Sequence, residues 1–416
     1  MIKKILALLL SVMLTFTLFT ACTDDEDSSS ESSSSSSDSD SSDDEDTDDE
    51  EETTEIVEAS LTIDGEEIDT TDLVMFTIGD NYEVTFDEFR YNYYYFMASY
   101  GSSYGVTEDD MADLTEEEQD EKFTIFKNYL IQFIMSTYTY LQYAEDNGIE
   151  LTEDELQECE DEIADLKEEQ GDDYEDYLKS AYLTEDYLRK LVNQSQIADK
   201  VKSTFELTDD EFIEIAKTDL YQVKTLLVPY GYDLTPSDED LEEMGVDDFD
   251  SLTNSVKMTL LVSTYSDLSD DEQEEQSEKA LEHITNLVDR ANDGEDFDDL
   301  IEEYGFDGGM TTYSGGYIVG DFYTSYGDTF VDTLFDLDID EISEPYEFSY
   351  GYMALKRVEI DEDYIRDDLE NDTDDDDSFK EEYEEEYEYK TLQDVMDTMS
   401  IEETDILTNL SYGDLT

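Results

Sequence analysis

The stretch SYGYMALKRV, Ser349–Val358, decides how the middle of this chain folds. Small, aromatic and aliphatic residues run up to the cationic pair Lys356 and Arg357, a composition typical of a buried strand. Met353 lies inside this predicted strand. An apolar thioether packs well there but cannot orient a carboxylate, so the role of Met353 must be explained from its surroundings.

The residues before this strand predict a mixed α and β domain. A strand is expected in YQVKTLLVPY, Tyr221–Tyr230, and a helix over Glu278–Ala291. His283, the single histidine of the chain, falls on that helix and is expected to face solvent without a catalytic role. Apolar residues at three- and four-residue spacing form the expected inward stripe of the helix: Ala280, Leu281, Ile284, Leu287 and Val288.

Four local strings in this region resemble the parvulin-type (PpiC) peptidyl-prolyl isomerases. That family shows GEDF, DPGM, GEISEPV and YGYHIIK in order. The corresponding strings here are Gly294–Phe297, Asp307–Met310, Glu341–Pro345 and Tyr350–Lys356. The resemblance covers about residues 221–359. It implies an α+β fold, in which a small antiparallel sheet surrounded by helices is inserted into a helical, chaperone-like domain.

By this resemblance both histidines of the family's site are missing. Met353 stands at the position of the second histidine, and Thr225 at the position of the first, before an apolar run. A second candidate for the first strand is VKMTLLV, residues 256–262, where the equivalent residue is Thr259. The sequence leaves the two registers open, and both place threonine at the site.

The resemblance also implies the other site residues. Asp307 corresponds to the acidic or cysteine residue at the centre, Tyr326 and Phe330 to walls of the proline pocket, and Ile318 to a further apolar wall. Isomerisation of an Xaa-Pro bond crosses a barrier of ~18–20 kcal/mol without breaking a bond. The predicted chemistry therefore requires neither a metal nor a cofactor.

The sequence outside residues 221–359 predicts helices. We expect an N-terminal helical domain over 57–220 and an acidic C-terminal helical segment over 360–416, with a helix over 379–399. These flanks resemble those of PrsA-type foldase lipoproteins and the related SurA chaperones. Four capping boxes mark expected helix starts: Thr85 with Glu88, Thr115 with Glu118, Thr152 with Glu155, and Thr208 with Glu211.

The first residues predict export and lipidation. An apolar run over 5–19 follows two lysines and is too short for an ordinary transmembrane helix, which indicates a signal peptide over 1–21. The string LFTAC, ending at Cys22, resembles a bacterial lipobox. Two acyl chains on Cys22 anchor a protein stably, so we expect it on the outer face of a cell membrane. Residues 22–56, rich in Ser, Asp and Glu, are expected to form a disordered tether.

The charge of the chain limits the classes of molecule that it is expected to bind. Asp and Glu number 121 against 21 Lys and Arg, a formal net charge of −100 that disfavours nucleic acid and anionic lipid as partners. The nearest approach to a calcium loop, from Asp289, has Ala291 and Leu300 at ligand positions and fails.

Three hypotheses remain open from the sequence. The first is an extracytoplasmic foldase that isomerises Xaa-Pro bonds in unfolded exported polypeptides. The second is a chaperone of the same fold that has lost this activity. The third is a cation-buffering surface lipoprotein in which the domain merely persists.

Overall fold

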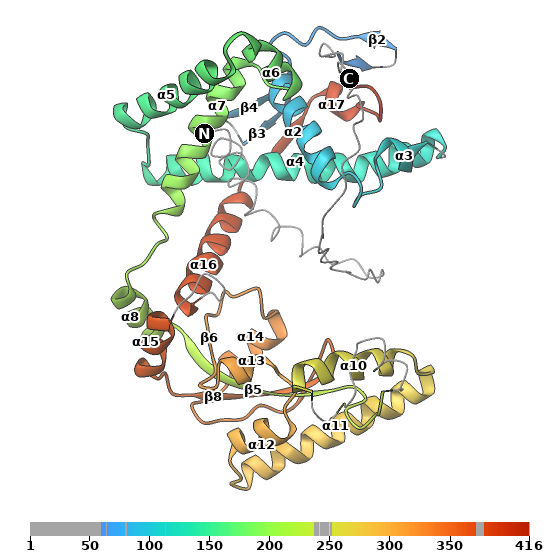
Figure 1. Ribbon diagram of the computed structural model, residues 1–416, viewed down its shortest axis with the longest axis vertical. Helices are drawn as coiled ribbons and strands as arrows, with labels where there is room; N and C mark the ends of the chain where they lie inside the picture. The colour runs from blue at the N-terminus through green and yellow to red at the C-terminus, as the bar shows by residue number, and fades with distance from the viewer. Residues whose placement is uncertain are drawn as a thin grey trace, which may run out of the picture. The chain divides into compact units, whose positions relative to one another are not determined.

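The computed structural model describes residues 60–63, 65–79, 81–112, 114–236, 241, 249, 252–371 and 378–415 (Figure 1). The predicted signal peptide, Cys22 and the tether lie outside these residues. Within them, no helix has the length and apolar character needed to cross a bilayer. The chain forms two compact units. The helical unit comprises the described residues of the ranges Met1–Thr204 and Leu392–Thr416, and the sheet unit comprises those of Phe205–Thr391.

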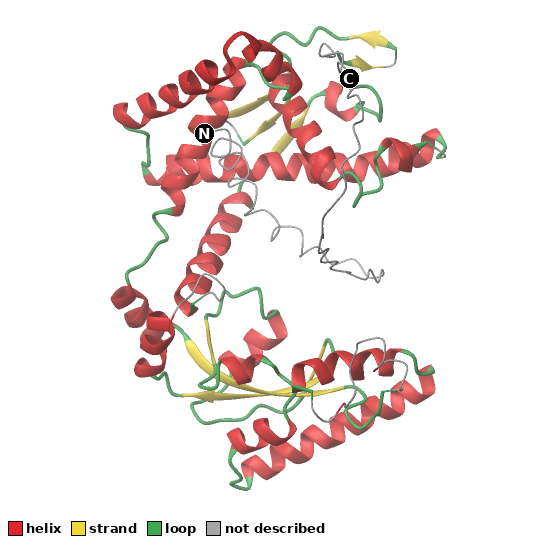
Figure 2. Cartoon of the chain, in the orientation of Figure 1, coloured by secondary structure: helices red, strands yellow, loops and turns green. Residues whose placement is uncertain are grey.

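The helical unit is built from long helices around a small sheet (Figure 2). Its sheet has the antiparallel order β4-β3-β9, so a strand from the end of the chain completes a sheet begun near residue 74. Its elements are β1 (Thr62–Ile63), β2 (Glu66–Glu67), β3 (Val74–Ile78), β4 (Tyr82–Thr85), α2 (Phe86–Tyr100), α3 (Glu108–Met111), α4 (Glu116–Asn147), α5 (Glu153–Gln170), η2 (Gly171–Asp173), α6 (Tyr174–Ser180), α7 (Glu185–Lys202), β9 (Ile401–Glu403) and α17 (Asp405–Thr408).

Three of the four predicted capping boxes are confirmed, at the starts of α4, α5 and α8 (Asp209–Asp219). The prediction at Thr85 is wrong. Thr85 precedes α2 but makes no side-chain cap, because Glu88 is buried and binds Lys190 and Tyr138 from other helices. Glu88 therefore forms an ion pair with a residue far away in the sequence in place of the predicted capping box.

The sheet unit is organised around a four-stranded antiparallel sheet of order β6-β5-β8-β7. Its long central pair is β5 and β8, in which Thr225 faces Leu355 and Leu227 faces Met353. The elements of this unit besides α8 are β5 (Tyr221–Pro229), α10 (Asn254–Ser266), α11 (Asp270–Asn292), α12 (Phe297–Tyr304), α13 (Gly309–Thr312), β6 (Tyr317–Val319), α14 (Asp328–Phe335), β7 (Tyr346–Phe348), β8 (Gly351–Val358) and α15 (Glu362–Asn371), together with most of α16 (Phe379–Met396).

Alternation along β5 and β8 separates two cores. Leu226, Val228 and Ala354 pack against α11 and α12 on one face of the sheet. Leu227, Met353 and their neighbours pack on the other face with Phe330 and Leu334 of α14. The predicted α+β class with a small antiparallel sheet among helices is confirmed, and the candidate site lies on the α14 face.

The structure settles which strand comes first. Tyr221–Pro229 forms β5, whereas the alternative run at 256–262 lies within the helix α10. The helix predicted over Glu278–Ala291 lies within α11, and α10, α12, α13 and α14 accompany it.

The predicted stripe of α11 is confirmed at four positions, but Leu281 is 38% exposed. His283 does not simply face solvent, because it is half-buried and its ring stacks on Tyr232 at a centroid distance of 4.4 Å.

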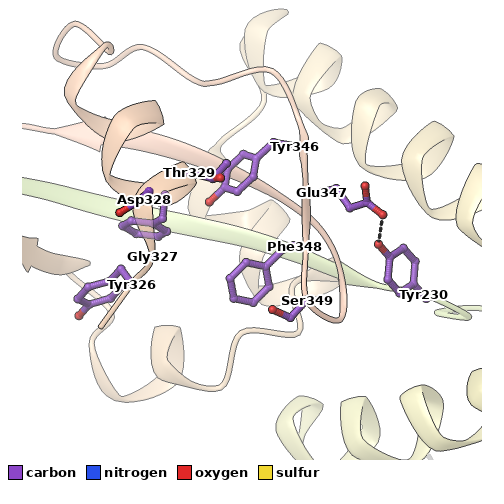
Figure 3. A pocket seen from close by; sticks show the side chains of 10 residues that line it. Tyr230, Tyr326, Gly327, Asp328, Thr329, Tyr346, Glu347, Phe348 and Ser349 are labelled. Carbon is purple, nitrogen blue, oxygen red and sulfur yellow. Dashed lines mark hydrogen bonds between the residues drawn. The ribbon is translucent and has the colours of Figure 1, made fainter. Parts of the chain in front are cut away.

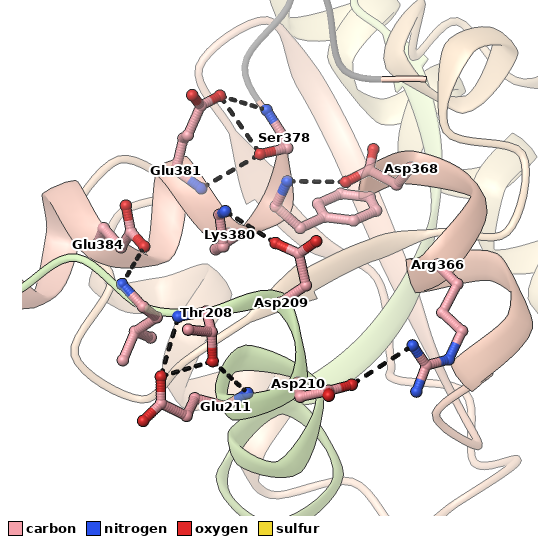
Figure 4. A network of polar contacts seen from close by, with 12 residues as sticks. Thr208, Asp209, Asp210, Glu211, Arg366, Asp368, Ser378, Lys380, Glu381 and Glu384 are labelled. Carbon is pink, nitrogen blue, oxygen red and sulfur yellow. Dashed lines mark hydrogen bonds and ion pairs between the residues drawn. The ribbon is translucent and has the colours of Figure 1, made fainter. Parts of the chain in front are cut away.

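The sheet unit includes helices from both sides of the predicted domain 221–359. Polar contacts join α8, α15 and the start of α16 (Figure 4): Lys380 Nζ lies 2.9 Å from Asp209 Oδ1, and Arg366 lies 3.7 Å from Asp210. The N–H of Leu207 donates to Glu384 at 2.7 Å. These contacts explain why the compact unit begins at residue 205 and extends to 391, beyond the predicted limits.

Candidate functional site

The centre of the candidate site is the half-buried carboxylate of Asp307, in the loop between α12 and α13. The N–H of Phe306 donates to the carbonyl of Leu227 at 2.9 Å, which fixes this loop against β5. Asp307 accepts hydrogen bonds from three sources. They are the N–H of Gly309 at 2.9 Å, the hydroxyl of Tyr317 at 3.0 and 3.1 Å, and the hydroxyl of Thr225.

Tyr317 is a member of this cluster that the sequence reasoning missed. Its hydroxyl lies so close to Gly309 that a Cβ there would come within 1.8 Å of the oxygen. Burial, and then the neighbouring Asp307 charge, raise the pKa of Tyr317, so the phenol stays protonated and donates. The available signal was the pair Gly308–Gly309, which leaves room beside Asp307 for a large side chain from β6.

The two residues at the histidine positions have different surroundings. Thr225 is buried on β5 and donates to Asp307. Met353 is buried on β8, where its sulfur accepts a hydrogen bond from the hydroxyl of Tyr346 at 3.2 Å. The structure therefore brings Thr225 and Asp307 together and joins Met353 to Tyr346 of the adjacent strand β7.

An aromatic pocket opens beside this cluster (Figure 3). Its volume is about 490 Å³, and the rings of Tyr326 and Phe330 stack at a centroid distance of 5.0 Å. Ile318 is fully buried in the core behind this pocket and is not among its lining residues. The lining residues come from the turn after β5, from the loop before α14 and its first residues, and from β7 and the turn after it: Tyr230, Tyr326, Gly327, Asp328, Thr329, Phe330, Tyr346, Glu347, Phe348 and Ser349.

One ring contact links the pocket to the polar cluster, since the ring of Tyr317 lies 5.6 Å from that of Tyr326. Tyr346 also lines the pocket, and its hydroxyl donates to Met353 on the same face of the sheet. The carboxylate cluster and the aromatic pocket thus form one continuous site on one face of the sheet.

The charges at the pocket are all negative. Asp328 and Glu347 are the acidic side chains among its lining residues, and the hydroxyl of Tyr230 donates to Glu347 at 2.8 Å (Figure 3). Such a rim favours neutral or cationic ligands over anionic ones. Among the described residues, no group of His, Cys, Asp and Glu has the arrangement of a metal site.

Comparison with known proteins identifies the domain. Residues 246–359 match the sequence profile described as the PPIC-type PPIASE domain, so the chain contains a domain of this parvulin family. The match begins after β5, which supplies the first strand of the sheet and Thr225. A search of curated proteins finds no match to the chain.

The chain is also similar to solved structures. The peptidylprolyl isomerase PrsA from Bacillus cereus is 19% identical, with a TM-score of 0.28, over 71% of this chain and 90% of that one. PrsA from Bacillus subtilis is 17% identical, with a TM-score of 0.21, over 78% and 91%. A solved structure from a study of PEB4 and Cj1289 of Campylobacter jejuni, described as SurA-like chaperones, is 15% identical, with a TM-score of 0.15, over 82% of this chain and 98% of that one. The domain assignment rests on the profile match, not on these scores.

Proposed function

We propose that this chain, which contains a PPIC-type domain, is an extracytoplasmic foldase that isomerises Xaa-Pro bonds in exported polypeptides without the family's two histidines. The observation that carries the proposal is the continuity of the Asp307 cluster with the aromatic pocket. The rotation breaks no covalent bond, so the site needs to hold a proline ring and favour the twisted amide.

The pocket suits this task physically. Stacked aromatic rings offer an apolar surface to a proline ring, and an apolar surrounding favours the twisted amide because its carbonyl has lost conjugation and carries less charge. A thousandfold acceleration asks for only ~4 kcal/mol of differential stabilisation. That amount is within reach of a pocket of this size.

Hydrogen bonds from residues other than histidine orient the carboxylate at the centre of the site. Thr225, Tyr317 and the N–H of Gly309 together hold Asp307 in one orientation beside the pocket. Loss of the usual histidine network is expected to cost on the order of 1–3 kcal/mol. The expected result is catalysis that is roughly 5- to 150-fold slower than with histidines, rather than none.

Asp307→Asn tests this proposal. The amide keeps the shape of the side chain but places an N–H₂ group against donors, so we expect kcat/KM on a capped Ala-Pro peptide to fall about tenfold or more, as measured by NMR exchange spectroscopy. Asp299→Asn, on the exposed surface of α12, is the matched control. Equal rates in both variants would remove Asp307 from the mechanism.

A second function, chaperoning without isomerisation, is favoured by the surroundings of Met353. Its thioether is turned to Tyr346 and has no recorded contact with Asp307 among the described residues. This alternative predicts that the chain suppresses aggregation of a proline-free client in a light-scattering assay while its isomerase activity is absent. Failure to suppress aggregation would count against it.

The proposed location follows from Cys22. Cys22→Ser is expected to move the protein from the membrane fraction to the medium and to abolish labelling by radioactive palmitate. A Cys159→Ser variant, in which the buried cysteine is replaced, serves as control. Membrane retention of the Cys22 variant would contradict lipid anchoring.

A further inference from the structure

The wall of the aromatic pocket is held by a helix outside the matched domain. The domain match ends at residue 359, whereas the start of α16 lies in the same compact unit as the pocket. The carboxylate of Glu386 on α16 accepts from the N–H of Thr324 at 2.9 Å, the Thr324 hydroxyl at 3.1 Å and the N–H of Ser325 at 2.9 Å. One buried carboxylate thus satisfies three donors of the loop that leads into the pocket.

A second carboxylate of α16 contacts Tyr326, which lines the pocket. Glu382 lies one turn before Glu386, and its carboxylate interacts with Tyr326, the tyrosine that stacks on Phe330. Aromatic packing reinforces the contact, since the ring of Phe322 lies 5.6 Å from that of Tyr383 on α16.

The base of α16 is fixed independently of the pocket. Ser378 and Glu381 cap its first turn, the N–H of Phe379 donates to Asp368 of α15 at 2.9 Å, and Lys380 pairs with Asp209 (Figure 4). The start of the helix is therefore held by contacts outside the pocket, and the pocket loop is hydrogen-bonded to the same helix.

We infer that Glu382 and Glu386 are positioning residues of the isomerase site, which hold Tyr326 and its loop in the geometry that binds proline. The inference rests on the proposed function. It extends the site beyond the PPIC-type domain to α16, so that the domain without this helix would have a loosened pocket.

The contact of Glu382 with Tyr326 also makes the pocket sensitive to pH. Burial is the main cause that raises the pKa of Glu382 to about 7, and the charge of Glu386 adds to it. An ionised carboxylate accepts a stronger hydrogen bond than a protonated one, so Tyr326 is held more firmly above pH 7. The titratable groups that face Glu382 are Tyr317, Tyr323 and Tyr326 from the sheet side, Asp368 from α15, and Glu385 and Glu386 from its own helix.

The test measures both binding and turnover of a capped, uncharged Ala-Pro peptide with the full chain, by NMR titration and exchange spectroscopy. Glu386→Gln puts an amide N–H₂ against the loop donors and is expected to raise the peptide Kd about threefold to tenfold, with kcat changed less. Asp394→Asn, an exposed change further along the same helix, is the matched control and is expected to bind as the wild type does.

The pH profile separates positioning from general stability. Wild-type Kd is expected to fall about threefold between pH 5.5 and 8.5. Glu382→Gln and Tyr326→Phe, which remove the titrating group and the donor, are each expected to flatten this change. Tyr326→Phe removes a single oxygen, so it keeps the test decisive if Glu386→Gln fails to fold.

The outcomes distinguish the two proposals. Wild-type binding without turnover, weakened by Glu386→Gln, would support the positioning role and overturn the isomerase proposal. The positioning role alone would be overturned by two results together. They are a peptide Kd and turnover that Glu386→Gln leaves unchanged, and a change of Kd between pH 5.5 and 8.5 that persists in Glu382→Gln. A chain that binds no peptide would overturn both.

Discussion

Asp307 shows how a site residue is fixed by neighbours that are far away in sequence. Its loop carries the string that resembles the parvulin family, so the residue itself was predictable, as were Tyr326 and Phe330. Tyr317 was not, because its contact depends on β6 lying beside β5 and on the missing side chain at Gly309. The sequence could suggest the members of the site but not the donors that orient them, and the roles of all these residues stay predictions.

Tyr317→Phe removes one oxygen atom and tests whether the hydrogen bond from the Tyr317 hydroxyl to Asp307 matters for activity. Removal of the hydroxyl takes away one hydrogen bond of about 1 kcal/mol, so kcat/KM is expected to fall about threefold to tenfold while the melting temperature changes little. Tyr352→Phe is the matched control, because its hydroxyl contacts Ser277 of α11 at 3.1 Å instead. Equal activity of the two variants would contradict a role for Tyr317.

At the scale of elements, local signals predicted helix starts well and failed where tertiary contacts competed. Thr115 and Thr208 form their capping boxes with exposed glutamates, and Glu155 caps Thr152 while it also pairs with Lys200. The run at 256–262 was ambiguous because a short apolar run fits either a strand or a helix face. Only its neighbours in three dimensions decide between them.

The ion pair between the buried Glu88 and the partly exposed Lys190 gives the helical unit a specific vulnerability. The two groups lie 2.6 Å apart, and the Glu88 side chain is 2% exposed. Lys190→Met leaves this carboxylate without its cation, so we expect the free energy of unfolding at pH 8 to fall by about 3 kcal/mol in urea titrations.

The cost at Glu88 is expected to shrink near pH 5. Burial raises the pKa of Glu88, with Lys190 opposing that rise, so loss of the cation lets the carboxyl take a proton and become neutral. Lys167→Met is the control, since its ion pair with Glu185 is exposed and is worth about 0–1 kcal/mol. Equal losses for the two lysines would contradict this account of the pair.

Glu155 at the start of α5 is expected to make the helical unit less stable as the pH falls below about 4.5. Hydrogen bonds from Lys200, and then from Thr152, lower the pKa of Glu155 from 4.5 to about 2. A lowered folded-state pKa gives stability that is present above pH 4.5 and is lost as the pH falls towards 2. The urea midpoints of the wild type and Glu155→Gln should therefore differ at pH 7 and converge towards pH 2, whereas the exposed Glu158→Gln should show no such trend.

At the scale of the whole molecule, the formal net charge of −100 opposes the folded state. Like charges repel more strongly in a compact chain than in an unfolded one, and salt screens them over a Debye length of about 10 Å at 0.1 M. We expect the melting temperature to rise by several degrees between 10 and 500 mM NaCl. Choline chloride should give the same rise, and an effect confined to one cation would indicate a specific site instead.

Domain limits were the hardest feature to predict at this scale. Residues 360–391 look like an acidic appendix, yet α15 and the start of α16 pack in the sheet unit through Asp209, Asp368 and Glu386. Nothing in the spacing of these residues indicates their partners, because each pair joins segments between about 10 and 170 residues apart.

The most direct test of the account is the cis–trans exchange rate of a capped Ala-Pro peptide with the wild-type chain and with Asp307→Asn, measured by NMR exchange spectroscopy. The account predicts acceleration by the wild type that falls about tenfold or more in the variant, with both proteins folded. An exchange rate equal to that of the free peptide in both samples would contradict the claim that this site isomerises proline bonds.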